Sequence, residues 1–340
     1  MRIVIVSGGT GGHIYPGVAI ADEIKARDKQ AKILFLGSRD GLEKELVEKA
    51  GYKIELIRSR AFLRKISYKA ISAPFVSAVG FFQAFFILKK YSPGVLVSTG
   101  GYASLPVVLA ASLLRIPIVL HEQNVLPGQV NRFCARFAKQ VFLSFKESKK
   151  YLKGEVVGNP VRKEIIDAPR KKSQQKVVLI MGGSQGAKKI NETVISSLDK
   201  LPPDIKIIHI IGNRDFGWVS RYLEGKKIDN YYPQPYLHES IAEALASADL
   251  VVSRAGATAI AEFLARGLPM ILIPFPYAAE DHQRLNAKVI EEDGAAVVVK
   301  DNDLTPELFV SLIVKTALNY DRMKLAKLDA AKRIVDYIYA

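Results

Sequence analysis

The chain has 340 residues, and at roughly 100–200 residues per domain this length predicts two domains. Hydrophobic residues make up 49% and charged residues 24%, which excludes an intrinsically disordered chain. The single cysteine, Cys134, excludes a disulfide framework and a cysteine-based zinc site. The first residues enter a strand-like run without the features of a signal peptide, so we expect a cytoplasmic protein.

The 49 basic and 34 acidic residues give a formal net charge of +15, and most of the excess lies in residues 1–160. No acidic residue occurs between Glu55 and Glu122. A basic first half predicts a polyanionic partner, either nucleic acid or an anionic membrane surface.

Short β-branched runs alternate with helix-length segments, which is typical of parallel sheets in α/β proteins. The expected strands are Arg2–Val6, Ile33–Leu36, Val95–Val97, Ile118–Leu120, Val141–Leu143, Val177–Met181, Lys206–Ile211, Leu250–Val252, Met270–Ile273 and Ala295–Val299. Helices are expected at Val18–Ala26, Ile190–Leu198, Ile241–Ala246 and Ala259–Ala265. The pattern predicts an α/β fold with two doubly wound domains.

A weak internal repeat supports two similar domains with a cleft between them. Ile3–Gly12 and Val177–Gly186 both read as a strand, a glycine-rich loop and a helix start, and the polar segment Asp167–Lys176 is the candidate boundary. The charged stretch Asp321–Tyr339 predicts a terminal helix that crosses back to the first domain. Its expected buried face consists of Met323, Leu325, Leu328, Ile334, Val335 and Ile338.

Residues 70–88 form an uncharged run that is long enough for a transmembrane helix. Pro74, Gly80 and Gln83 dilute the run, so a buried core helix and an interfacial helix are the stronger alternatives. We favour the interfacial helix, because basic residues flank the run and a purely apolar run does not suit nucleic acid. The expected membrane patch consists of Lys65, Lys69, Phe75, Phe81, Phe82, Phe85, Phe86, Lys89 and Lys90.

The loop Ser7–His13 (SGGTGGH) follows the first strand and suits a phosphate group near a helix N-terminus. It is not a dinucleotide fingerprint, because Ile14 replaces the third glycine and Gly37–Arg39, rather than an acid, follows the second strand. His13 is either a general base at the mouth of this loop or a helix-start histidine that is hydrogen-bonded locally. Polar loops at Ser98–Tyr102 and His121–Asn124 (HEQN) follow two further strands and predict one shared site.

The second half repeats this arrangement with Gly182–Gly186, Arg254–Glu262 and Glu280–Asn286. Glu262 interrupts an apolar helix and is either a ligand for a ribose diol or part of a solvated helix face. Asp301–Asp303 matches a metal-binding D-x-D pattern, but Thr305 follows as a helix N-cap with proline after it, so we expect a helix-start loop there and no metal site.

Five segments resemble one known family in order and spacing. They are Gly8–Ala21 (GGTGGHIYPGVAIA), His121–Arg132 (HEQNVLPGQVNR), Gly158–Arg162 (GNPVR), Gly182–Ala187 (GGSQGA) and Ala248–Ala287. Together they span almost the whole chain, and they resemble the MurG family of bacterial peptidoglycan N-acetylglucosaminyltransferases, in glycosyltransferase family 28.

The resemblance implies a GT-B fold, in which two Rossmann-like domains face each other across a cleft. Residues 1–162 and about 322–340 would bind the acceptor and the membrane, and residues 163–321 would bind UDP-GlcNAc. The implied reaction is inverting transfer of GlcNAc to the 4-hydroxyl of MurNAc in undecaprenyl-pyrophosphoryl-MurNAc-pentapeptide (lipid I to lipid II), without a metal or other cofactor. The implied location is the cytoplasmic face of the inner membrane, bound peripherally to its anionic surface, with cell-wall synthesis proteins as further partners and no nucleic acid.

The resemblance also implies residue roles. His13 is the implied base, and Glu122 is its rival. The implied donor contacts are Thr10, Gly11, Gly12, Asn124, Arg162, Ser184, His238, Ala257, Thr258, Ala259, Ile260, Ala261, Glu262 and Gln283. Among these, Glu262 would meet the ribose hydroxyls and Gln283 the GlcNAc hydroxyls, while His238 replaces an apolar residue that is usual in the family. Two alternatives stay open: a diacylglycerol glycosyltransferase, and a non-catalytic sugar-nucleotide or nucleic-acid binding protein.

Overall fold

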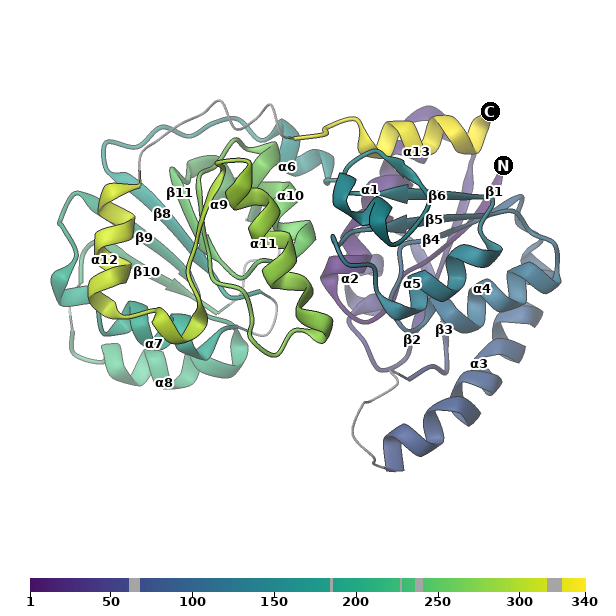
Figure 1. The fold of residues 1–340 in the computed structure, drawn as a ribbon, viewed down its shortest axis with the longest axis horizontal. Helices are drawn as coiled ribbons and strands as arrows, with labels where there is room; N and C mark the ends of the chain where they lie inside the picture. The colour runs from purple at the N-terminus through teal and green to yellow at the C-terminus, as the bar shows by residue number, and fades with distance from the viewer. Residues whose placement is uncertain (61–67, 184–185, 227, 236–240, 317–325) are drawn as a thin grey trace. The chain divides into compact units, whose positions relative to one another are not determined.

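The computed structural model describes residues 1–340 except 61–67, 184–185, 227, 236–240 and 317–325 (Figure 1). The chain divides into two compact units. Unit 1 contains Met1–Arg162 together with Lys327–Ala340, and unit 2 contains Lys163–Ala326. The candidate boundary Asp167–Lys176 therefore falls inside unit 2, a few residues after the chain has left unit 1.

Unit 1 is built on a seven-stranded parallel sheet with the strand order β3-β2-β1-β4-β5-β6-β7. Its strands are β1 (Arg2–Val6), β2 (Lys32–Ser38), β3 (Lys53–Ile57), β4 (Val95–Ser98), β5 (Ile118–Glu122), β6 (Gln140–Leu143) and β7 (Glu155–Val156). The central strands are mostly apolar and almost fully buried because helices cover both faces of the sheet, and polar residues occur at the carboxyl ends of β4 and β5.

Six helices accompany this sheet. They are α1 (Gly11–Arg27), α2 (Glu43–Lys49), α3 (Tyr68–Tyr91), α4 (Ser104–Leu113), α5 (Gln129–Cys134) and α13 (Ala330–Tyr339). Helices α1 and α13 enclose one core layer, which includes Ile14 and Ile334, and α3 and α4 enclose another, which includes Leu88 and Val107.

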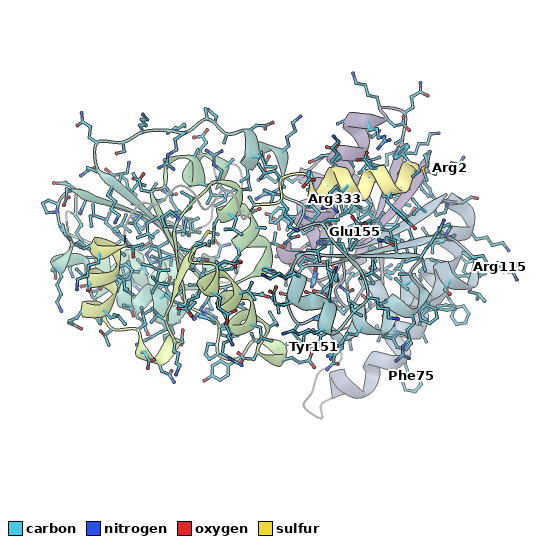
Figure 2. All side chains as sticks on the ribbon, turned by 45° about the horizontal axis from the view of Figure 1, so that its top comes forward. Arg2, Phe75, Arg115, Tyr151, Glu155 and Arg333 are labelled. Carbon is cyan, nitrogen blue, oxygen red and sulfur yellow. The ribbon has the colours of Figure 1, made fainter. Side chains whose placement is uncertain are left out.

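The terminal helix returns to unit 1, as the sequence predicts, and packs against α1. Ile334 and Val335 are fully buried there and Ile338 is half-buried. The helix starts only at Ala330, so Leu328 lies in the preceding turn and is exposed, contrary to expectation. Met323 and Leu325 lie outside the described residues. Figure 2 shows Arg333 of α13 beside Glu155 of β7, and these side chains form an ion pair of 2.5 Å.

Helix α3 carries apolar side chains on two faces. Ala84 and Leu88 are fully buried, and Phe81 and Phe85 are half-buried against the same core, so these two phenylalanines are not the exposed residues we expected. The exposed apolar stripe is instead Phe75, Val79, Phe82 and Phe86, whose spacing of four, three and four residues keeps them on one helical face. In Figure 1 the first turns of α3 extend away from the rest of unit 1, and Figure 2 shows Phe75 on them.

Lys89 and Lys90 at the end of α3 are exposed. Lys65 lies outside the described residues, and the side chain of Lys69 is not described either. Among the helices that the structure describes, none combines the length and apolar character needed to cross a bilayer.

Unit 2 repeats the architecture with a six-stranded parallel sheet in the order β10-β9-β8-β11-β12-β13. Its strands are β8 (Lys176–Met181), β9 (Ile205–Ile210), β10 (Tyr231–Gln234), β11 (Leu250–Ser253), β12 (Met270–Leu272) and β13 (Ala296–Val298). Its helices are α6 (Lys163–Asp167), α7 (Lys188–Ile195), α8 (Asn213–Leu223), α9 (Ile241–Ser247), α10 (Ala257–Ala265), α11 (His282–Glu292) and α12 (Pro306–Lys315).

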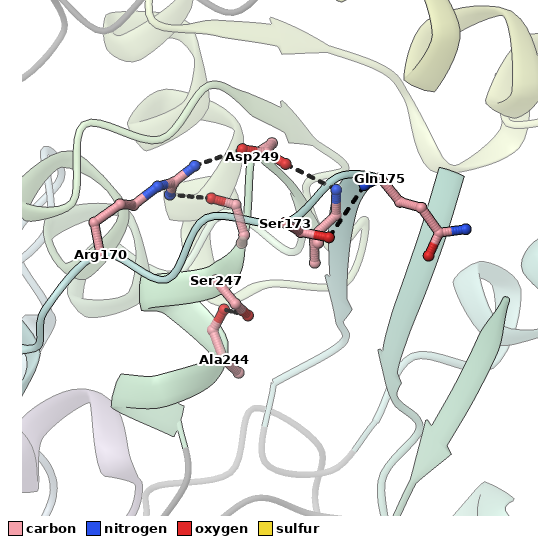
Figure 3. A network of polar contacts seen from close by, with 8 residues as sticks. Arg170, Ser173, Gln175, Ala244, Ser247 and Asp249 are labelled. Atoms are coloured by element: carbon pink, nitrogen blue, oxygen red, sulfur yellow. Dashed lines mark hydrogen bonds and ion pairs between the residues drawn. The ribbon is translucent and has the colours of Figure 1, made fainter. Parts of the chain in front are cut away.

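The polar segment that precedes β8 is fastened to unit 2 by side chains (Figure 3). The Arg170 guanidinium donates to the Ala248 carbonyl and forms an ion pair of 2.5 Å with Asp249. The second oxygen of Asp249 accepts from the Val177 amide at 2.8 Å, which ties the segment to the first strand of the unit. The polar residues of this segment therefore attach it to the surface of unit 2, and the segment does not separate the two units.

Candidate active site

In unit 1 the site is built where the strand order reverses. Strands β1 and β4 are neighbours, yet their helices leave in opposite directions along the sheet, and ligands of open α/β sheets bind at the carboxyl ends of such strands. The loops that follow these two strands touch through their backbones, since the Gly8 amide donates to the Gly100 carbonyl at 3.0 Å. A Cβ atom on Gly101, whose φ is +86°, would lie 2.2 Å from the Gly8 carbonyl oxygen. Close packing of the loops thus explains part of this glycine content.

A buried carboxylate supports the first loop. Glu43, at the start of α2, is 0% exposed, and its Oε1 accepts from the Gly9 amide at 2.8 Å and from the Ser38 amide at 3.1 Å. The sequence places no acid directly after the second strand. Glu43, five residues beyond Ser38, nevertheless lies against the end of that strand and the first loop. Because the Gly8 and Gly9 amides are used inside the protein, anion binding would fall to the residues after them, Thr10 to Gly12.

His13 lies in the first turn of α1 and is half-buried. Its Nδ1 is 3.0 Å from the Thr99 carbonyl oxygen and 3.0 Å from Oε1 of Gln123. A carbonyl oxygen can only accept, so Nδ1 carries the proton, and in the neutral ring Nε2 is the basic atom. Thr99 also donates its hydroxyl to the His13 carbonyl at 2.8 Å, which fixes the start of α1 to the end of β4.

Glu122 has a different environment, although it also ends a strand of this sheet. It is 1% exposed, and its Oε1 accepts from the Asn124 amide at 2.8 Å and from the Asn124 side chain at 3.2 Å. Its Oε2 accepts from the Gly128 amide at 3.2 Å and from the Asn131 side chain at 2.8 Å. Both carboxylate oxygens therefore hold the loop that leads into α5.

Other expected residues of unit 1 lie near α1. Thr10 and Gly12 are exposed and Gly11 is half-buried, and the Thr10 carbonyl accepts from the His13 amide at 3.0 Å. Arg162 is buried, and its guanidinium carbon lies 3.9 Å from the ring centre of Tyr15, so this cation stacks on the second turn of α1. Unit 1 thus gathers a histidine, a glycine loop and an arginine around the start of a single helix.

Unit 2 has the corresponding reversal between β8 and β11. Helix α10 follows β11 and begins after Gly256, with no side-chain cap on its first amides. Glu262 is only 6% exposed, which is inconsistent with a solvated helix face and leaves the alternative in which its carboxylate has a specific partner. Ser184 and His238 lie outside the described residues.

The remaining expected residues of unit 2 lie on α10 and at the start of α11. Thr258 and Ile260 are buried along with Ala257, whereas Ala259 and Ala261 are half-buried. At the start of α11, Gln283 uses its side-chain oxygen to accept from the Phe275 amide at 2.9 Å.

Sequence reasoning missed the supporting role of Glu43, and it named Arg254 and Asn286 only as members of the polar segments Arg254–Glu262 and Glu280–Asn286. Arg254 donates to the Ile273 carbonyl at 3.1 Å and pairs with Asp301 at 2.5 Å, and buried Asn286 donates to the Ala255 carbonyl at 3.3 Å. Asp301 begins a short 3₁₀ helix, and Thr305 caps α12 by accepting from the Leu308 amide at 3.2 Å, as expected. The only signal for Arg254 was a charged residue directly after a buried strand.

Two parallel α/β units, a terminal helix returning to the first and polar loops at each strand reversal are the features of a GT-B fold. The family models for the N-terminal and C-terminal domains of glycosyltransferase family 28 match residues 3–143 and 177–337. The chain belongs to this family and, within it, to the MurG group.

Individual relatives support this assignment. The chain is 41% identical to the UDP-N-acetylglucosamine--N-acetylmuramyl-(pentapeptide) pyrophosphoryl-undecaprenol N-acetylglucosamine transferase of Halothermothrix orenii, over 95% of this chain and 92% of the relative. It is 37% identical to the enzyme of the same name from Thermoanaerobacter sp. strain X514, over 99% of both chains. The crystal structure of Acinetobacter baumannii MurG matches with a TM-score of 0.76 and 29% identity over 99% of both chains.

Proposed function

We propose that the protein transfers GlcNAc from UDP-GlcNAc to the 4-hydroxyl of MurNAc in undecaprenyl-pyrophosphoryl-MurNAc-pentapeptide, converting lipid I to lipid II. The relatives of 37–41% identity bear the name of this activity. The observation that carries the proposal in the chain itself is His13, because its Nδ1 faces two internal acceptors and its Nε2 is left as the basic atom of the ring.

In the proposed step the acceptor oxygen attacks the anomeric carbon of GlcNAc from the face opposite UDP. The new carbon–oxygen bond forms as the bond to the UDP oxygen breaks, so that the configuration inverts. His13 Nε2 takes the hydroxyl proton, and UDP leaves with the bonding electron pair. Glu122 is the weaker candidate for the base because its two oxygens already accept four hydrogen bonds.

The leaving diphosphate needs positive charge. The backbone amides at the start of α10 and the guanidinium of Arg162 are the groups we assign to it, which requires no metal or other cofactor. Thr10, Gly11, Gly12, Asn124, Ser184, His238 and Gln283 keep the donor contacts implied by the family. Residues Ala257–Glu262 lie along the nucleotide in this proposal, and Glu262 accepts from the ribose hydroxyls.

The acceptor hangs from a polyprenyl chain, so the enzyme has to work at a bilayer surface. The stripe of Phe75, Val79, Phe82 and Phe86 exposes apolar area that would enter the interface, and Lys89 and Lys90 would meet anionic headgroups. We therefore propose peripheral binding at the cytoplasmic face of the bacterial inner membrane.

The test is transfer of radiolabelled GlcNAc from UDP-GlcNAc to a lipid I analogue, with diacylglycerol as the competing acceptor. We expect label in the lipid I analogue alone, release of UDP only when that acceptor is present, and the same rate after treatment with EDTA. Label in diacylglycerol, or UDP binding without any transfer, would reject the proposal. A strict requirement for a divalent cation would reject its metal-free chemistry.

A further inference from the structure

A continuous chain of hydrogen bonds leads from His13 into the interior of unit 1. His13 Nδ1 is 3.0 Å from Oε1 of Gln123, whose Nε2 is 3.1 Å from Nδ1 of His121. On its far side, Nε2 of His121 is 2.9 Å from the carbonyl oxygen of Gly158. The chain therefore links the candidate base, at the start of α1, to the segment through which the polypeptide leaves unit 1.

Two backbone carbonyls fix the direction of every hydrogen bond in this chain. The Thr99 carbonyl accepts from Gln123 Nε2 at 2.8 Å, so the amide nitrogen of Gln123 faces Thr99 and its oxygen faces His13. The Gly158 carbonyl requires a proton on Nε2 of His121, so Nδ1 of that ring accepts from Gln123. The only arrangement that satisfies both carbonyls puts the His13 proton on Nδ1.

Burial strengthens the preference for these hydrogen-bond directions. Gln123 is 2% exposed, and Thr99 and His121 are 0% exposed, so water competes poorly for their polar atoms. Burial also lowers the pKa of His121 to about 4, which keeps this ring neutral at neutral pH, as its acceptor role requires. A cation at His121 would also oppose charge on His13.

We propose that Gln123 is a positioning residue that acts with the Thr99 carbonyl, both 3.0 Å from His13 Nδ1, to favour the His13 tautomer with its proton on Nδ1 and so makes Nε2 the proton acceptor. The assignment rests on the proposed function, because it gives His13 the role of base. It adds a residue that does not touch the acceptor and acts only through the histidine ring. His13 is then a base whose second ring nitrogen is held by an orienting partner, and that partner is the neutral side-chain amide of Gln123.

The tautomer can be measured without any catalysis. Spectra of protein labelled with ¹⁵N-histidine distinguish the two ring nitrogens, and the signals of His13 are identified by their loss in His13→Gln. We expect a protonated Nδ1 and an unprotonated Nε2 in the parent protein. In Gln123→Met, which keeps the side-chain length and removes both polar groups, the Thr99 carbonyl remains as an acceptor for Nδ1, so we expect the population with the proton on Nε2 to rise above that of the parent. Gln175→Met is the matched control, since Gln175 is half-buried at a site in unit 2, and the hydrogen bond described for its side chain goes to the Pro203 carbonyl.

A parent protein with the proton on Nε2 of His13, or a Gln123→Met variant with an unchanged tautomer, would overturn the inference. The ¹⁵N-histidine spectra give the His13 tautomer even if the chain transfers no GlcNAc. Failure of the positioning role and failure of the proposed function are therefore distinguishable. Thermal unfolding of Gln123→Met accompanies the spectra and separates a loss of fold from a change of tautomer.

Kinetics supply the second arm. We expect Gln123→Met to lower kcat by about 10-fold or more, within the range that general-base catalysis contributes, while KM for UDP-GlcNAc stays within about twofold. Gln123→Glu places a carboxylate beside the imidazole and stabilises its protonated form, so the acid limb of the pH–rate profile moves to higher pH. A purely structural glutamine would lower the amount of folded enzyme without moving that limb, and an unmoved limb would overturn the proposal.

Discussion

His13 lies in the first turn of α1 and Glu122 at the end of β5, and their different hydrogen-bond partners allow different chemistry. Nδ1 of the His13 imidazole bonds inside the protein, and in the proposed function Nε2 meets the substrate. Both oxygens of the Glu122 carboxylate accept hydrogen bonds from the loop after β5. Acid–base roles follow from such differences in environment more than from residue type. The sequence places both residues at strand ends and leaves the choice open, because no pattern in it shows that the Asn124 and Asn131 side chains and two backbone amides all donate to Glu122.

The first prediction separates these two residues. His13→Ala removes the proton acceptor, so we expect turnover to fall by about 10²- to 10⁴-fold while UDP affinity changes little. Steady-state transfer kinetics and calorimetric titration with UDP measure the two quantities.

Glu122→Gln is the comparison for that prediction. It exchanges one acceptor oxygen for a donor that faces Gly128 or Asn131, so we expect a loss of about 1–3 kcal/mol in the free energy of unfolding. Near-normal turnover in His13→Ala, together with loss of turnover in a fully folded Glu122→Gln, would reverse the assignment.

The second prediction concerns Glu43. Removing its side chain leaves the buried amides of Gly9 and Ser38 without an acceptor, so Glu43→Ala should cost about 1–3 kcal/mol in the free energy of unfolding. Glu43→Gln keeps one acceptor oxygen and should recover most of that loss. Urea unfolding followed by far-ultraviolet circular dichroism measures both variants. Equal stability of Glu43→Ala and the parent chain would contradict this role.

At the scale of elements, the sequence predicts the inner strands of both sheets and the edge strand β13, and it misses the other three edge strands. The strands it misses are β3, β7 and β10, each at an end of its sheet. Only one face and one edge of such a strand meet the core, so β3 alternates in burial and β10 tolerates Pro233. The polar loop residues were found by their place after buried strands. Glu43, which supports the first loop, depends on long-range folding and leaves no local pattern, and the position of Arg254 after a buried strand does not predict its partners Ile273 and Asp301.

The third prediction belongs to α3. Because the core contacts of this helix come from Ala84, Leu88 and the two half-buried phenylalanines, Phe82→Ser combined with Phe86→Ser should leave the fold intact. Each loss of a large apolar side chain removes up to roughly 1.5–3 kcal/mol of burial in the interface, so binding to vesicles with anionic lipids should weaken at least tenfold.

Vesicle sedimentation measures this binding, and Val314→Ser, an exposed apolar position on α12, is the matched control. Activity on a short-chain, water-soluble acceptor should stay unchanged in the double variant. Vesicle binding equal to that of the parent protein would exclude the stripe as the membrane contact.

Across the whole molecule, each unit buries a neutral histidine in a polar cluster. Burial lowers the pKa of His121 in unit 1 to about 4 and that of His209 in unit 2 to about 3, both from an ordinary value of 6.5. His209 contacts the Tyr231 hydroxyl at 2.8 Å and the Asn191 side chain at 3.0 Å. The repeated strand–loop–helix pattern predicts the two units, but nothing local in the sequence predicts that a histidine will be sealed in each.

The fourth prediction follows from linkage. Below about pH 6.5 the unfolded chain protonates these histidines while the folded chain does not until about pH 4 or 3. The unfolded state then binds more protons, so stability falls as the pH drops, with a slope that approaches about 1.4 kcal/mol per pH unit for each histidine.

The fluorescence of Trp218, the single tryptophan, reports the unfolding of unit 2 in urea. His209→Gln should be less stable at pH 7 but should show a shallower loss between pH 6.5 and 4.5. A slope identical to that of the parent chain would exclude His209 as its source.

The return of α13 has a consequence for how the chain matures. Ile334 and Val335 complete a hydrophobic layer that Ile14 and Val18 begin, yet the ribosome delivers them only after all of unit 2 has emerged. Until α13 has been synthesised, part of the apolar core of unit 1 therefore stays uncovered. Unit 2 can complete its own core before that point. A premature stop codon just after unit 2 would leave unit 2 whole and unit 1 open to proteases and chaperones.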